Sequence, residues 1–277
     1  MMRVAAIQMN SGPDVAANLQ RVRELTTQAA DAGARLVVLP ENVALMPSSQ
    51  ASRVQAAEAE GSGPIQQTLA DIARNAGVWL VGGTIPLRVD GDPNRVAPAL
   101  LVFDPAGQVI ARYDKIHLFD VEVPGESKRQ YRESDDFVAG GPVRCVQVDD
   151  VCVGLSICYD LRFPELYRQL VEQGAQVLVA PSAFTAQTGR AHWDLLLRAR
   201  AVENLAFVIG ANQTGVHPRG HQTWGHSKII DPWGRTLAAA ETMPGFVLAD
   251  LDLEQQRQTR TRFPVLSHRR LIHNENP

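Results

Sequence analysis

Apolar residues follow two spacings along the chain, and the exchange of one spacing for the other predicts alternating strands and helices. Residues 4–9 form a short apolar run that predicts a strand, and a helix follows over about 15–32. Asp14 suits the N-cap of that helix, and Gly33 suits the position just beyond its end. The next segment, ARLVVLPE over 34–41, lacks polar alternation, which is typical of a strand buried on both faces.

The pattern then changes and adds antiparallel pairs to this strand–helix arrangement. A second helix over 65–76 stops at Gly77, and VWLVGGTIP (78–86) predicts another buried strand. The segments 100–115 and 228–239 each predict a hairpin. In both, Asp-Pro-x-Gly joins two apolar runs and suits a type I turn.

Between the hairpins, strands and helices alternate again. The predicted elements there are strand 151–158, helix 163–173, strand 175–182, helix 192–204 and strand 206–214. The chain contains no linker and no low-complexity tract, so we predict one α/β domain over 1–277 with mixed sheets. Two sheets packed face to face, with helices outside, would accommodate both the buried strands and the hairpins.

Composition excludes several classes of protein. The formal net charge of -3 argues against a general nucleic-acid or membrane-surface partner, because both need a basic excess. The N-terminal apolar run is too short for a signal peptide, and no run approaches the roughly 20 residues of a membrane helix. Three cysteines in a chain of 277 residues do not suggest a disulfide framework. We expect a cytoplasmic protein with reduced cysteines.

Cys158 is the cysteine whose position suggests chemistry. It closes an apolar strand, and Pro164 suits the first turn of the helix that follows. A nucleophile at such a corner is exposed at the sheet edge, nearby backbone N–H groups can face an oxyanion, and the helix dipole favours thiolate. A small buried core residue is the alternative, and Cys145 and Cys152, inside apolar strands, fit that alternative better.

Glu41 and Lys115 are the other candidates. Glu41 ends a buried strand, where a carboxylate points into the ligand crevice of an α/β protein and desolvation makes it a usable base. An ordinary surface glutamate at the start of a loop remains the alternative interpretation. Lys115 stands among apolar residues and needs a partner to keep its charge there, although, for this residue taken singly, a lysine extending from an edge strand to solvent fits better.

Together, these residues and their surroundings resemble the nitrilase superfamily of carbon–nitrogen hydrolases, whose hallmark is Glu, Lys and Cys in this chain order. Glu41 stands in LPEN, Lys115 in YDKIHLFD and Cys158 in SICYDLRFPEL. The resemblance covers essentially the whole chain. It includes PSAF (181–184), AHW (191–193), RARAVEN (198–204), GHS (225–227) and DPWG (231–234).

The resemblance implies a four-layer α-β-β-α sandwich and a role for each residue. Cys158 is the nucleophile, Glu41 the general base, and Lys115 with the backbone N–H of Tyr159 stabilises the oxyanion. The segment YRES implies a second active-site glutamate, Glu133, which orients Lys115 and keeps it charged. The implied reaction turns an amide into acid and ammonia through a thioester, without metal or organic cofactor.

Weaker motifs resemble the deaminated glutathione amidase branch. These are HLFDVEVPG (117–125), TGRAHWDLLLRARAVEN (188–204) and FPVLSHRR (263–270). The neighbouring ω-amidase branch, acting on α-ketoglutaramate, shares the triad, and a nitrilase or carbamoylase stays open. Such substrates carry carboxylates, for which Arg162, Arg190 and Arg198 are unranked candidates.

Other function classes fit less well. His217, His221 and His226 suggest a metal site, but their spacing is loose and no cysteine is near, so a polar loop is favoured. His226 is expected to form structural hydrogen bonds near the pocket. A non-catalytic interaction protein would not need the triad with Glu133, and a thiol redox protein would need a resolving cysteine.

The basic C-terminal tail, about 259–277, is expected to pack on its own or a partner subunit. Phe263, Val265 and Leu266 are apolar in a segment without periodic structure. Because family resemblance implies a homodimer or a larger oligomer, we predict a symmetric dimer whose interface includes 263–270.

Overall fold

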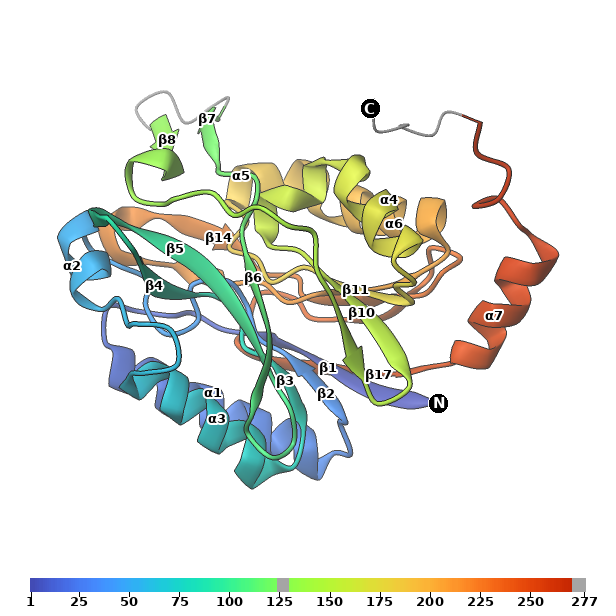
Figure 1. Ribbon diagram of the computed structural model, residues 1–277, viewed down its shortest axis with the longest axis horizontal. Helices are drawn as coiled ribbons and strands as arrows, with labels where there is room; N and C mark the ends of the chain where they lie inside the picture. Colours follow the sequence, from blue (N-terminus) through green and yellow to red (C-terminus); the bar gives the residue numbers. More distant parts are fainter. Residues whose placement is uncertain (124–129, 271–277) are drawn as a thin grey trace.

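Two mixed β-sheets pack face to face between two pairs of helices in this computed structural model, which describes residues 1–123 and 130–270. Figure 1 shows α1 (Val15–Asp31) and α3 (Pro64–Ala76) outside one sheet, with α4 (Pro164–Glu172) and α6 (Asp194–Asn204) outside the other. The predicted α/β class and the four-layer α-β-β-α sandwich are therefore confirmed.

The first sheet has the strand order β17-β1-β2-β3-β5-β4, with β6 paired to β5. Its strands are β1 (Met2–Gln8), β2 (Leu36–Val38), β3 (Trp79–Val81), β4 (Ile85–Val89), β5 (Asp92–Phe103), β6 (Val109–Asp114) and β17 (Gly245–Leu251). The strands β1, β2 and β3 are parallel, whereas β17, β4, β5 and β6 add antiparallel pairs.

The second sheet has the order β16-β15-β12-β11-β10-β9. Its strands are β9 (Cys145–Val148), β10 (Val151–Leu155), β11 (Val177–Val179), β12 (Phe207–Gly210), β15 (Lys228–Ile230) and β16 (Thr236–Ala239). Two small hairpins pair β7 (Asp120–Glu122) with β8 (Gln130–Arg132) and β13 (Thr214–Val216) with β14 (Gln222–Trp224).

The central strands of the first sheet, β1, β2 and β3, are mostly apolar because each face of that sheet has its own hydrophobic core. In β1, Val4 and Ala6 join the cluster between the two sheets, whereas Ala5 and Ile7 join the cluster beneath α1 and α3. Successive side chains point to opposite faces, so burial of both faces removes polar alternation. The prediction of strands buried on both faces is confirmed.

The local signals at helix ends and turns are also confirmed. The Asp14 side chain accepts a hydrogen bond from the Ala17 N–H and caps α1, and Gly77 ends α3 in the left-handed conformation. In the hairpin turns, Asp104 and Asp231 each accept the backbone N–H of the residue two positions later at 2.9 Å.

One predicted strand is divided in two by a close backbone approach. The segment 78–86 forms β3 and the start of β4, and Gly83 lies between them at φ 64. A Cβ atom on Gly83 would lie 2.1 Å from the carbonyl oxygen of Pro40. Glycine is therefore required beside the loop that carries Glu41.

The predicted tail begins within a helix. α7 (Leu253–Arg262) is helical, so 259–262 is not a segment without periodic structure. The Arg260 guanidinium donates to the carbonyl oxygens of Leu205 and Ala175, which packs this helix on its own chain. Phe263 is 51% exposed and contacts the Trp233 ring edge-on. The last residues of the predicted tail, 271–277, lie outside the described residues.

Candidate active site

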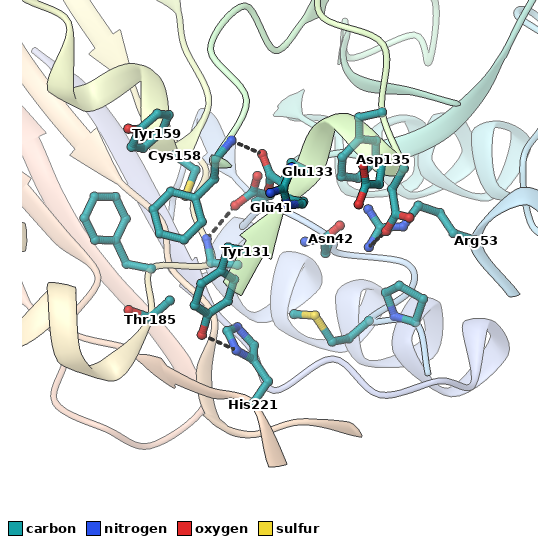
Figure 2. Close-up of a pocket in the computed structure, with 18 of the residues that line it drawn as sticks. Glu41, Asn42, Arg53, Tyr131, Glu133, Asp135, Cys158, Tyr159, Thr185 and His221 are labelled. Atoms are coloured by element: carbon teal, nitrogen blue, oxygen red, sulfur yellow. Dashed lines mark hydrogen bonds and ion pairs between the residues drawn. The ribbon is translucent and has the colours of Figure 1, made fainter. Parts of the chain in front are cut away.

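The candidate residues meet where strands of both sheets end. Glu41 follows β2 by three residues, Cys158 follows β10 by three, and Lys115 directly follows β6. Glu133 directly follows β8 and opens a short 3₁₀ turn, Glu133–Asp135. A cavity of about 530 Å³ is lined by Glu41, Glu133 and Cys158, and Figure 2 shows the two carboxylates side by side within it.

Lys115 lies fully buried between two carboxylates. Its Nζ lies 2.8 Å from Glu41 Oε1, and 3.0 and 2.8 Å from the two Glu133 oxygens. Burial alone would lower the pKa of Lys115, but the charges of Glu133 and Glu41 together raise it well above its ordinary value. The structure thus places Lys115 as a charged group held between a buried and a part-buried carboxylate.

Glu41 is held in a fixed orientation with one oxygen on each side of the site. Oε1 accepts from Lys115, while Oε2 accepts the Ala183 N–H at 2.8 Å. Its backbone carbonyl accepts from the Gln213 side chain at 2.9 Å. Burial raises the pKa of Glu41, as does Glu133, whereas Lys115 lowers it, and the net direction is upward. A carboxylate with a raised pKa is a stronger base, as the sequence indicated.

Cys158 occupies a strained corner after β10. Its φ of 46 is unusual for a residue with a side chain, and its N–H donates to the Pro181 carbonyl at 2.9 Å. The residue opens a 3₁₀ turn, Cys158–Arg162, and α4 begins only at Pro164. The sharp corner predicted for the nucleophile is present.

In the free site, burial and local charge oppose the thiolate that the helix dipole was expected to favour. Burial and the Glu41 charge raise the pKa of Cys158 well above its ordinary value, against the lowering effect of Lys115. The thiol is therefore protonated in the free site and needs a base.

A buried aspartate that the sequence analysis missed ties the lysine segment to the cysteine turn. The Asp160 carboxylate accepts from the Tyr113 hydroxyl at 2.6 Å, the His117 N–H at 3.0 Å and the Ile157 N–H at 2.9 Å. The His117 ring lies 2.7 Å away through Nδ1. The available signal was position, since Asp160 stands two residues after Cys158 and His117 two residues after Lys115.

Glu133 also anchors the segment beyond Lys115. Its Oε2 accepts the Phe119 N–H at 2.8 Å in addition to the Lys115 bond. Lys115 has three N–H donors, and the three contacts with Glu41 and Glu133 match that number. Lys115 can therefore stabilise an oxyanion through its charge, or as a donor once a Glu133 contact is released.

The predicted arginine candidates separate in space. Arg162 lines the cavity, with its guanidinium 5.5 Å from the centre of the Phe184 ring. Arg198 is half exposed and pairs with Asp194, and Arg190 lies over the Trp224 ring. A further arginine on the cavity wall, Arg53, was not recognised.

The three histidines have different surroundings. The His217 ring contacts the Ser11 carbonyl and the Thr223 hydroxyl, and the His226 ring contacts the Trp224 carbonyl. His226 thus forms the structural contact expected of it. Within residues 1–123 and 130–270, no group of three or more His, Cys, Asp or Glu side chains could hold a metal ion. No helix in those residues is long and apolar enough to span a membrane.

Comparisons with known proteins show which proteins this chain resembles. The carbon-nitrogen hydrolase family model matches residues 3–261. A Synechocystis deaminated glutathione amidase is 43% identical over 96% of this chain and 97% of its own, and the omega-amidase NIT2 of Danio rerio is 36% identical over 97% and 94%. The crystal structure of the C. elegans NitFhit protein matches with a TM-score of 0.89 and 36% identity, covering 97% of this chain and 65% of that one.

Proposed function

Since the chain belongs to the carbon–nitrogen hydrolase family, we propose that it is an amidase that forms a thioester on Cys158 with a carboxylate-bearing substrate. The observation that carries this proposal is the buried Glu41–Lys115–Glu133 cluster beside a strained cysteine. Two of these ionisable side chains, Glu41 and Lys115, are buried at a cost and Glu133 is part-buried, and each of the three has a use in acyl transfer.

The first step is attack on the amide. Glu41 takes the Cys158 proton as the sulfur attacks the carbonyl carbon, because the thiol does not ionise by itself in this site. The carbonyl electrons move to oxygen. The charge of Lys115 and the N–H of Tyr159, the residue after the nucleophile, stabilise that oxyanion.

The second step releases the amine and restores the enzyme. Protonated Glu41 transfers its proton to the leaving nitrogen, the C–N bond breaks and the acyl group stays on sulfur. Glu41 then takes a proton from water, whose oxygen attacks the thioester. The carboxylic acid leaves and the sulfur regains a proton from Glu41.

The substrate proposal follows the more similar of the two branches compared above. Deaminated glutathione is a tripeptide without its amino group, so its amide bonds are secondary and their hydrolysis releases an amine. The ammonia expected from the sequence therefore applies only to a primary amide such as α-ketoglutaramate. We favour deaminated glutathione because the Synechocystis amidase is more similar than the zebrafish omega-amidase.

Arg162 is our candidate for the carboxylate on the acyl side of the substrate. It lies on the cysteine side of the cavity, with its guanidinium 5.8 Å from the centre of the Tyr159 ring. A guanidinium there can bind a carboxylate on the acyl chain, close to the carbonyl that Cys158 attacks. Arg162 is thereby selected from the three arginines that the sequence offered.

A panel of four substrates tests the proposed function. Deaminated glutathione, α-ketoglutaramate, a nitrile and an N-carbamoyl amino acid are compared for kcat/KM, with Cys158→Ala as the blank. We expect the highest value for deaminated glutathione and none in the blank. Turnover confined to the nitrile or the carbamoyl compound would contradict the proposal, and binding without turnover would indicate the non-catalytic alternative.

Three further properties belong to the proposal. We propose a single domain over 1–277, a cytoplasmic location and a homodimer with 263–270 at its interface. The half-exposed rings of Trp233 and Phe263 support the last, because they form an apolar contact that is still open to solvent.

A further inference from the structure

Arg53 lies on the wall of the active-site cavity with most of its hydrogen-bonding capacity unused. It comes from α2 (Gln50–Gln55), and its side chain is 14% exposed. The guanidinium lies over the Phe137 ring, 4.1 Å from its centre, and 3.7 Å from Asp136 Oδ2. Among the described residues, none accepts a hydrogen bond from Nε or Nη1, and both atoms are buried.

A guanidinium in this position is unfavourable unless an anionic ligand binds beside it. A charge-assisted hydrogen bond to a guanidinium is about 2.7–2.9 Å long, so the contact with Asp136 is a loose ion pair. Burial lowers the pKa of Arg53, although Asp136, Glu133 and Glu41 oppose that effect. Because the guanidinium lines the cavity and has no close acceptor among the described residues, its charge can attract a carboxylate that enters the cavity.

Charges on the cavity wall are mixed, so an anion is not attracted everywhere. The lining side chains that carry charge are Glu41, Glu133, Asp135, Asp136, Arg53, Arg132 and Arg162. A carboxylate is favoured only next to a guanidinium, where attraction exceeds repulsion from the neighbouring acids. A carboxylate is therefore expected to bind beside a guanidinium such as that of Arg53, and not elsewhere on the cavity wall.

Arg53 and Arg162 lie on opposite sides of the catalytic groups. Figure 2 shows Tyr159 and Cys158 on one side of Glu41 and Arg53 on the other. Arg162 lies on the same side as Tyr159, because its guanidinium is 5.8 Å from the centre of the Tyr159 ring. A substrate that meets both arginines has a carboxylate on each side of its scissile bond.

Resting on the proposed amidase function, we propose that Arg53 binds a carboxylate on the leaving-group side of the substrate. Glu41 must meet the leaving nitrogen to protonate it, so the chain beyond that nitrogen extends on the Glu41 side, where Arg53 lies. The substrate class is then an acyl-amino acid or acyl-peptide with a free C-terminal carboxylate. A small primary amide does not use this contact.

The test compares one substrate with its neutral counterpart. Deaminated glutathione and its C-terminal carboxamide are hydrolysed by wild type, Arg53→Gln and Arg53→Lys, and the ratio of the two kcat/KM values is measured. Wild type is expected to prefer the acid. Arg53→Gln is expected to reduce that preference about 10- to 100-fold, mainly through KM, as for loss of hydrogen bonds to a charged group. Arg53→Lys keeps the positive charge but lacks the planar pair of N–H donors, so its ratio should lie between those of wild type and Arg53→Gln.

Arg198→Gln serves as the matched control, because Arg198 is half exposed and is not among the residues that line the cavity. Its ratio should equal that of wild type. If Arg53→Gln lowers both values equally through kcat, Arg53 only positions the Glu133–Phe137 turn, and the proposal is overturned.

Failure of the inference and failure of the proposed function look different. A wild type that hydrolyses acid and carboxamide equally well overturns the role of Arg53 while amidase activity stands. A wild type that hydrolyses no amide overturns both. Thermal unfolding shows whether Arg53→Gln is folded, and Arg53→Lys carries the test if it is not.

Discussion

The β9–β10 hairpin and the turn that follows β10 place cysteines in contrasting surroundings. Cys145 and Cys152 lie within β9 and β10, where their sulfurs approach backbone carbonyls of Leu170 and Gln173. Cys158 lies beyond the end of β10, beside Glu41 and Lys115. Burial raises the pKa of Cys145 to about 12, and burial also raises that of Cys158. A lowered pKa therefore does not distinguish the proposed nucleophile; an adjacent base and a strained corner do.

Substitution of the cysteines should give the largest difference between the two regions. Cys158→Ala removes the proposed nucleophile and should lower kcat by a factor on the order of 10⁴ or more. Cys145→Ala and Cys152→Ala should keep most of the activity, because neither residue lines the cavity. Steady-state kinetics with matched thermal unfolding checks this, and similar losses at all three positions would mean that packing has been mistaken for chemistry.

Glu133→Gln should have the next largest effect, since it keeps the shape of the side chain and removes the charge that holds Lys115. We expect kcat to fall by a factor on the order of 10² or more, the range for losing an oriented electrostatic group. The measurement is kcat at saturating substrate, with Glu172→Gln, an exposed glutamate at the end of α4, as the control. A wild-type rate would remove Glu133 from the site.

The pH profile should move by a smaller amount and in a defined direction. Glu41 acts as a base only when ionised, so its raised pKa places the acid limb of kcat/KM above the ordinary value of 4.5. Glu133 contributes to that rise through its charge. Glu133→Gln should therefore shift the acid limb to lower pH, and a shift to higher pH would contradict the charge arrangement.

Removal of the tail should have the smallest effect on chemistry and a measurable effect on assembly. Because α7 ends at Arg262, a chain ending there keeps the helix and loses only the residues from Phe263 onward. We expect a weaker dimer in sedimentation experiments at low micromolar concentration. If the shortened chain is as dimeric as the full one, residues 263–270 only pack on their own subunit.

Sequence reasoning located the catalytic candidates because strand ends and long motifs both point to them. Glu41, Lys115 and Cys158 each follow a strand, and the resemblance assigned their roles before any contact was known. The resemblance also implied that Glu133 contacts Lys115, which the structure shows. The pattern of residues alone could not predict that contact, because Glu133 follows the β7–β8 hairpin, whose strands are too short to leave a periodic signal.

The missed helices share a physical reason. α2 has no buried residue and α7 has only Gln256, so neither has the apolar stripe by which a helix is recognised. Arg53 was overlooked for that reason. β17 was missed because its side chains are mostly half-buried and its partner, β1, lies at the other end of the chain.

Trapping of the covalent intermediate tests the central claim most directly. The protein is mixed with deaminated glutathione, quenched with acid during turnover and digested with trypsin. The peptide over 145–162, which contains all three cysteines, is then fragmented in the mass spectrometer to assign the acyl group to a single residue. We predict the acyl group on Cys158 and none on Cys145 or Cys152. Turnover with the acyl group on either of these two, or with Cys158 never acylated, would contradict the account.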